Sequence, residues 1–178
     1  MKLLVRKLWF RGNIDEVMNE LFKIPQLDEQ FDEGYSYAGE IRPRGIMICS
    51  GYWPADAILD RLPESETDVN LVLTSLDLKG DYVRIHGKGR DLKAISSNNS
   101  YFWGVNNDIF YSNDVDFNSM TFGEIGHSLG LSHHEHDPKN PCEMSHNYHP
   151  CADWKSLDDV EFCDDCYSKL PKPTKVRV

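Results

Sequence analysis

The sequence of 178 residues has no apolar run approaching the length of a membrane-spanning helix. It also lacks a recognisable secretory signal, because Lys2, Arg6 and Lys7 interrupt the apolar start of the chain and no small-residue cleavage site follows. Such a start is typical of a first β-strand. We therefore expect a cytoplasmic protein without a membrane partner.

Positive charge is scarce as well: 19 lysine and arginine residues stand against 29 aspartate and glutamate residues, giving a formal net charge of −10. Nucleic-acid binding needs a clustered positive field, so the sequence argues against a nucleic-acid partner. Internal repeats, low-complexity tracts and long linkers are absent. The composition, 40% hydrophobic and 27% charged, is typical of a single globular domain over residues 1–178, and we expect a monomer.

The first two thirds of the chain predict alternating strands and helices. One helix is expected to begin after Asn13, which can cap it, and to end before Pro25. Another is expected at about 117–130, with Asp116 or Asn118 as its N-cap. Further predicted elements are strands at 3–10, 45–49, 69–73, 81–85, 101–105 and 109–112 and a helix at 55–62.

Histidine and cysteine are few but crowded. Six of the seven histidines lie between His127 and His149, and four of the five cysteines lie between Cys142 and Cys166. An odd number of cysteines without a secretory signal favours metal ligands over disulfides. We therefore expect the chemistry of this protein in the last third of the chain.

The most informative run is GEIGHSLGLSH, residues 123–133. Helical positions four apart share a face, so Gly123 and His127 point the same way, with Glu124 beside them. Gly130 can adopt the left-handed backbone conformation, end the helix and turn His133 back toward His127.

This run resembles the extended zinc motif of the metzincin peptidases, HExxHxxGxxH, in which three histidines hold zinc and the glutamate activates its water. Glu124, His127, Gly130 and His133 match the motif at its spacings, whereas Gly123 stands in place of the first histidine. The resemblance implies a catalytic zinc held by His127 and His133, with Glu124 as general base.

The missing histidine predicts that this zinc is weakened or absent. If a four-ligand site is worth about 10–16 kcal/mol, one lost ligand costs roughly 3–4 kcal/mol, or about a hundredfold to a thousandfold in affinity. His146, Tyr148 and His149 follow shortly afterwards and could substitute, but their spacing favours none of them.

Farther along, Cys163 and Cys166 form a CxxC pair, which suits either zinc binding or redox chemistry. With Cys142 and Met144 in a CxM element before it, the order resembles the archaemetzincin family, whose four cysteines bind a structural zinc. His134 stands where that family has its first cysteine. The resemblance implies a structural zinc bound by His134, Cys142, Cys163 and Cys166, a ligand set that zinc accepts.

Three other residues follow from the same resemblance. The loop to Cys142 is longer than the family's, which leaves His136 as a rival of His134 for the structural zinc. Met144 would be the Met-turn residue, forming an apolar floor beneath the catalytic metal. Cys151 has no counterpart and is interpreted as a spare thiol.

The resemblance also implies an α/β (α+β) fold: a metzincin-like domain with a mixed, twisted sheet, a backing helix and an active-site helix. Residues 1–130 would form an N-terminal subdomain and residues 131–178 a small, irregular subdomain stapled by zinc. Residues 69–78 resemble the family's strand with a Thr-x-x-Asp-Leu ending, and 101–112 resemble its edge strand, where substrate would lie.

The implied activity is zinc-dependent hydrolysis of peptide bonds in a peptide or protein substrate, impaired by Gly123. Two alternatives stay open. The chain could be a pseudopeptidase that binds peptides without cleaving them, or a zinc-stabilised scaffold or peptide-binding module whose one metal is structural.

Overall fold

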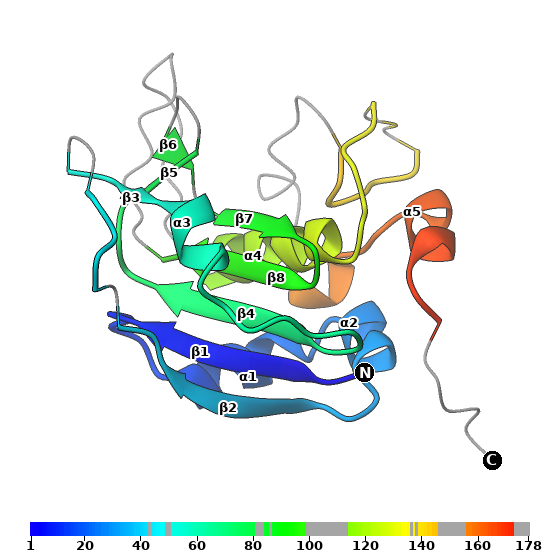
Figure 1. Cartoon of the computed structure of the whole chain (residues 1–178). Helices are drawn as coiled ribbons and strands as arrows, with labels where there is room; N and C mark the ends of the chain where they lie inside the picture. The colour runs from blue at the N-terminus through cyan, green and yellow to red at the C-terminus, as the bar shows by residue number, and fades with distance from the viewer. Residues whose placement is uncertain are drawn as a thin grey trace.

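The computed structural model describes residues 1–42, 44–48, 51–80, 84–85, 87–98, 114–135, 137, 139–145 and 156–172. A five-stranded sheet of order β2-β1-β4-β8-β7 forms its centre (Figure 1). Its strands are β1 (Leu3–Leu8), β2 (Tyr35–Glu40), β4 (Val69–Thr74), β7 (Gly87–Arg90) and β8 (Lys93–Ser97). The β2–β1, β1–β4 and β4–β8 pairings are parallel, and β7 runs antiparallel to β8. The predicted mixed sheet is confirmed.

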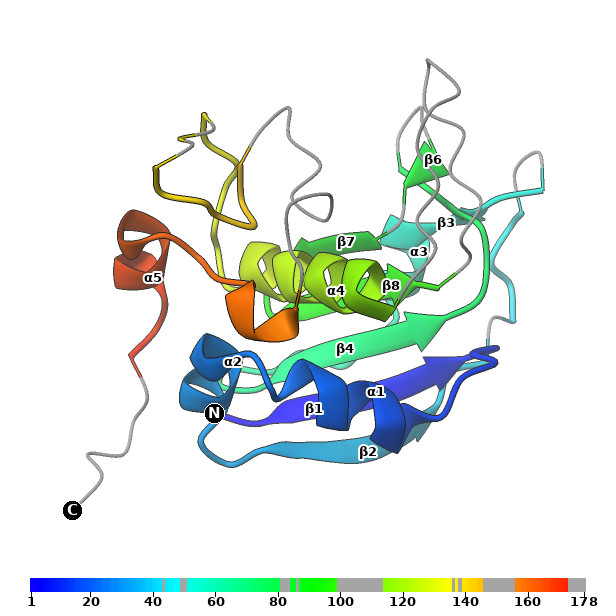
Figure 2. The same cartoon turned by 180° about the vertical axis from the view of Figure 1, so that it is seen from behind.

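Both faces of the sheet are covered, as the wholly buried strand β4 requires. The helices α1 (Ile14–Leu21), α2 (Pro25–Gln30) and α4 (Asp114–Ser128) lie on one face, and α3 (Ala55–Leu59) lies on the other (Figures 1 and 2). Neighbouring strand residues point to opposite faces, so Leu71 packs in the cluster of α1 and α4 while Val72 packs in the cluster of α3. The predicted α/β class is confirmed.

A second, three-stranded sheet consists of β3 (Trp53–Pro54), β5 (Leu78–Lys79) and β6 (Arg84–Ile85). The predicted strand at 45–49 is wrong over its described residues, 45–48, which form no strand. Gly45 has a φ of +74°, and Met47 and Ile48 are 85% and 48% exposed, so no neighbouring strand covers them. The strand pieces predicted at 101–105 and 109–112 lie outside the described residues.

Proline begins a helix here as well as ending one. Asn13 caps α1 as predicted, since its side-chain oxygen accepts a hydrogen bond from the Asp15 backbone N–H at 3.0 Å. Pro25 is the first residue of α2, a position where the missing N–H costs nothing because no helical partner exists for it. The predicted single helix is therefore followed by a second, short one.

The helix α4 begins at Asp114, three residues before the predicted start at 117. Asp116 and Asn118, predicted as alternative caps, lie inside the helix. Sequence patterns locate helix ends less reliably than the helices themselves, because a tertiary contact can extend a helix beyond its apolar repeat.

The C-terminal segment packs against the same core. Its described residues include the 3₁₀ turn η2 (Leu157–Asp159) and the short helix α5 (Asp164–Lys169). The Gln26 amide on α2 donates to the Phe162 carbonyl at 2.9 Å and accepts from the Phe162 N–H at 2.7 Å. Phe162 itself stacks on Phe122 of α4 with ring centroids 4.0 Å apart. The division into subdomains at residues 130 and 131 stays a prediction. Within the described ranges, no helix is long and apolar enough to cross a membrane.

Candidate metal centres

The face of α4 that carries Glu124 lies very close to β7, because two glycines in that strand leave room for it. A Cβ atom on Gly87 would lie 2.6 Å from Glu124 Cγ, and one on Gly89 would lie 1.9 Å from the Glu124 carbonyl oxygen. Neither position can hold a larger residue without separating the helix from the strand. This close contact holds Glu124 beside the edge strand of the sheet.

The end of α4 turns His133 back toward His127. Gly130 has a φ of +93°, its N–H donates to the His127 carbonyl at 3.0 Å, and the Leu131 N–H donates to the Gly126 carbonyl at 3.0 Å. These are the two hydrogen bonds of a Schellman ending. As a result the Nε2 atoms of His127 and His133 lie 3.1 Å apart.

The backbone fixes how both imidazole rings are protonated. The Nδ1 atom of His127 lies 3.0 Å from the Leu131 carbonyl oxygen, and that of His133 lies 3.3 Å from the Met144 carbonyl oxygen. A carbonyl oxygen only accepts, so each Nδ1 carries the ring proton and each Nε2 presents a lone pair. Two such lone pairs repel unless a cation lies between them.

That distance fits a zinc ion. Two imidazole nitrogens bound to one tetrahedral zinc at 2.0–2.1 Å are about 3.3 Å apart, close to the observed 3.1 Å. Glu124 is half-buried nearby, and burial raises its pKa to about 8, with Lys88 pulling it down by a smaller amount. The two rings can therefore hold a metal ion, and in the absence of that ion burial favours the protonated form of Glu124.

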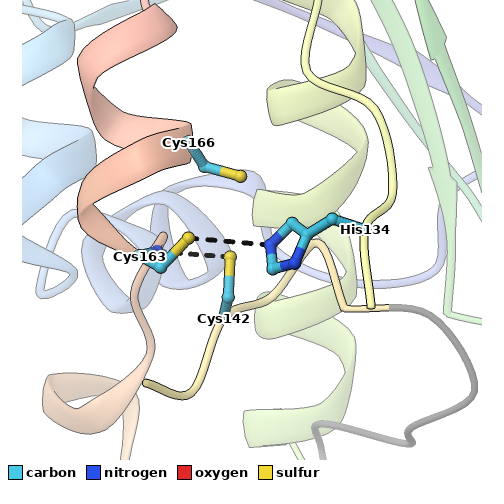
Figure 3. Close-up of side chains that lie close together, drawn as sticks. All are labelled: His134, Cys142, Cys163 and Cys166. Carbon is cyan, nitrogen blue, oxygen red and sulfur yellow. Dashed lines mark hydrogen bonds between the residues drawn. The ribbon is translucent and has the colours of Figure 1, made fainter. Parts of the chain in front are cut away.

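A second group of ligand atoms is larger and more deeply buried. The ligand atoms of four residues lie within 4.8 Å of one another: His134, Cys142, Cys163 and Cys166 (Figure 3). In the described part of the chain, no other group of three or more His, Cys, Asp or Glu residues is this compact. His134 Nε2 lies 3.6 Å from Cys163 Sγ, and the Cys163 N–H donates to Cys142 Sγ at 3.2 Å.

Three separate segments supply these four side chains. His134 follows the turn after α4, Cys142 lies in the loop before Met144, and Cys163 and Cys166 stand at the start of α5 (Figure 3). All three cysteines are free and buried. Adjacent sulfurs on a tetrahedral zinc at 2.3 Å are about 3.8 Å apart, so the cluster has the size of a zinc site.

The electrostatics of the cluster also fit a cation. Burial raises the pKa of Cys142, and burial together with the neighbouring Cys142 raises the pKa of Cys166. Thiols crowded in this way hold their protons unless a metal ion replaces them, whereas coordination to zinc deprotonates a thiol outright. The ligand set and its environment therefore suit Zn²⁺.

Met144 joins the two centres through its backbone. Its carbonyl oxygen contacts Nδ1 of His133 at 3.3 Å and accepts from the His134 N–H at 3.0 Å. Its side chain is fully buried, and a Cβ atom on Gly126 would lie 3.1 Å from its sulfur. The backbone role of Met144 was not predicted, since no side-chain pattern encodes it.

Glu143 is a site residue that the sequence pattern did not indicate. A Cβ atom on Gly123 would lie 3.3 Å from Glu143 Cγ and 3.4 Å from its Oε1. A largely buried carboxyl group, 7% exposed, thus faces the position where the motif's first histidine is missing. The available signal was the glutamate at the middle of the CxM element. The predicted alternatives His136, His146, Tyr148, His149 and Cys151 lie outside the described residues.

Comparisons with known proteins identify the fold. No protein-family model matches the sequence, and no curated protein matches it. Among solved structures, an archaemetzincin from Methanopyrus kandleri aligns over 94% of this chain and 92% of its own, with 22% identity and a TM-score of 0.67. An archaemetzincin from Archaeoglobus fulgidus aligns over 96% of this chain and 100% of its own, with 22% identity and a TM-score of 0.66.

A third structure, a zinc-dependent peptidase from Methanocorpusculum labreanum, aligns over 94% of this chain and 100% of its own, with 17% identity and a TM-score of 0.55. Identities this low establish the fold alone. The likeness nevertheless spans nearly the whole of each chain. This chain has the archaemetzincin fold.

Proposed function

We propose that this chain is a zinc-dependent metallopeptidase of the archaemetzincin type that hydrolyses peptide bonds, with Glu124 as its general base. The observation that carries the proposal is the pair of Nε2 atoms 3.1 Å apart on His127 and His133, each on a ring anchored through Nδ1. A zinc ion bound there would polarise the scissile carbonyl and lower the pKa of a bound water.

Glu124 has the environment that a general base needs. It lies three residues, nearly one turn, before His127 on α4, and Gly87 and Gly89 allow β7 to approach it. Without a metal ion, burial raises its pKa to about 8, so its surroundings favour the uptake of a proton by the carboxylate. Glu124 would take the proton from the attacking water and return it to the leaving amine.

The substrate would be a peptide or protein bound along the sheet. β7 is the antiparallel edge strand of the described sheet, and it lies directly over α4. An extended peptide can add to such an edge through main-chain hydrogen bonds. The edge strand predicted at 101–112 lies outside the described residues. The peptide would therefore add to β7, the edge strand of the described sheet.

The cluster of His134, Cys142, Cys163 and Cys166 would hold a structural zinc. All four positions would be filled by protein, which leaves no open position for a water molecule or a substrate. This zinc would tie the loop after α4 to α5 and so hold the Met144 carbonyl against His133.

One observation favours a second candidate function. Gly123 offers no ligand at the first position of the motif, and a site with too few ligands could bind peptides without cleaving them. In that case the purified protein would bind peptides, contain one zinc per chain and show no turnover.

The test is peptide cleavage by the zinc-loaded protein on a broad peptide library, with Glu124→Gln as the matched inactive variant. We expect turnover that falls by about a hundredfold or more in the variant, the usual contribution of a general base. Equal rates in both proteins, or no turnover from protein that contains two zinc ions per chain, would contradict the proposed activity.

A further inference from the structure

The side chain of Glu143 lies beside the position where Gly123 lacks a side chain. Gly123 and His127 are four residues apart on α4 and therefore share one face of the helix. On that face, the space where a side chain at position 123 would begin is bordered by Glu143, with its Cγ 3.3 Å and its Oε1 3.4 Å from a Cβ placed on Gly123. A carboxyl group thus borders the place of the absent imidazole.

The backbone around Glu143 is fixed on both sides. Its N–H donates to the Glu161 carbonyl at 2.9 Å, and the following Met144 carbonyl accepts from the His134 N–H at 3.0 Å. The Ser145 N–H closes the turn on the Cys142 carbonyl at 3.1 Å. Consecutive residues of this turn therefore serve different tasks: Cys142 faces the cysteine cluster, Met144 contacts both histidines, and Glu143 points toward α4.

A carboxylate in this place is chemically suited to zinc. Two histidines and one glutamate form a ligand set found in catalytic zinc sites, with zinc–oxygen distances of about 2.0–2.2 Å. Glu143 is only 7% exposed, so its carboxyl group lies inside the protein beside α4 rather than in solvent.

We propose that Glu143 supplies the third protein ligand to the metal held by His127 and His133, in place of the side chain that Gly123 lacks. This inference rests on the proposed function. In the described structure the ligand atoms of these three residues do not all lie within 4.8 Å of one another. Binding therefore includes a rotation of the Glu143 side chain across the bare backbone of Gly123.

A consequence is that Gly123 and Glu143 form a matched pair. Even a Cβ at position 123 would press against the Glu143 carboxyl group, and an imidazole needs still more room. Gly123→His alone would therefore crowd the turn, whereas Gly123→His together with Glu143→Ala would exchange one ligand for the other.

The experiment counts zinc per chain by elemental analysis after dialysis against buffers of graded free zinc. Wild type is expected to bind two zinc ions and His127→Ala one. Glu143→Gln should keep the first zinc and bind the second about a hundredfold to a thousandfold more weakly. Glu161→Gln is the matched control, since Glu161 is an exposed glutamate whose backbone carbonyl accepts from the Glu143 N–H, and it should behave like wild type.

The double variant Gly123→His/Glu143→Ala is expected to regain the second zinc. Retention of the first zinc and of the thermal unfolding temperature shows that each variant is folded. If His127→Ala loses the second zinc and Glu143→Gln binds it as tightly as wild type, the ligand role of Glu143 is wrong and the proposed function stands. If wild type itself binds only one zinc at every concentration, both proposals fall.

Discussion

The carboxyl group of Glu124 is held where its charge is unfavourable. Burial raises its pKa from 4.5 to about 8, against a smaller opposing effect of Lys88. Because the pKa in the folded protein lies above that in the unfolded chain, the folded state binds more protons between these two values. The free energy of unfolding therefore falls as the pH rises from about 4.5 to about 8, and the loss is complete above that range.

We predict that Glu124→Gln stabilises the protein that carries only its structural zinc. Glutamine cannot ionise, so the free energy of unfolding of the variant does not fall when the pH rises through the pKa of Glu124. Its thermal unfolding temperature should exceed that of wild type by at least about 3 °C at pH 8, corresponding to about 1 kcal/mol, and by less at pH 5. The measurement is thermal unfolding by circular dichroism at both pH values. A difference that is the same at pH 5 and pH 8 would contradict the raised pKa.

Single residues differ in how far the sequence reveals them. His127 and His133 are predictable, because their spacing around Gly130 follows from local helix geometry. Glu143 is not, because its contact with Gly123 joins positions 20 residues apart through a turn whose path depends on other segments. A missing motif residue can thus have a neighbour that only the folded chain identifies.

At the scale of elements, the C-terminal end of α4 decides the geometry of the histidine pair. Gly130, at a φ of +93°, lets the chain reverse immediately after the helix. A side chain at this backbone angle is strained whatever the space around it, by about 1–2 kcal/mol. The cost of any replacement is therefore conformational rather than a loss of packing.

We predict that Gly130→Ala weakens the binding of the second zinc as well as the fold. Gly34→Ala is a matched control, since Gly34 also has a positive φ, +68°, and its added Cβ would likewise meet nothing within 4 Å. Both variants should lower the free energy of unfolding by about 1–2 kcal/mol in urea titrations. Only Gly130→Ala should raise the zinc concentration needed to fill the second site. Equal zinc binding by both variants would show that the helix end does not position His133.

Element boundaries show where local rules fail. Pro25 begins α2 although it was expected only to end the preceding helix, and α4 starts at Asp114 rather than at 117. The strand β7, with its sequence Gly-Lys-Gly-Arg, was not predicted, because glycine and charged residues disfavour strands in isolation. In the folded chain the same glycines are required, since α4 leaves no room for a Cβ.

At the scale of the whole molecule, the cysteine cluster joins segments far apart in the sequence. His134, Cys142 and the Cys163/Cys166 pair come from three segments. The C-terminal segment is also held by the Gln26 amide, which forms two hydrogen bonds with the Phe162 backbone. Metal binding and core packing therefore both stabilise the last part of the chain.

We predict that Cys163→Ser removes the structural zinc and lowers the thermal unfolding temperature by about 10 °C, since one lost ligand costs roughly 3–4 kcal/mol. Cys49→Ser, at a cysteine outside the zinc motif, is the matched control and should leave the zinc content unchanged. Zinc content by elemental analysis and differential scanning calorimetry provide the two measurements. Unchanged zinc content and stability in Cys163→Ser would contradict the structural site.

Local periodicity, capping and spacing are enough to predict the α/β class, the glycine-ended helix and the order of histidines and cysteines from the sequence. The folded chain was needed to show that Glu143 borders Gly123, that the Met144 carbonyl contacts both His133 and His134, and that two glycines of β7 leave room for Glu124. These contacts join segments whose relative position is fixed by packing in the common core. Short-range preferences along the chain carry no information about that packing.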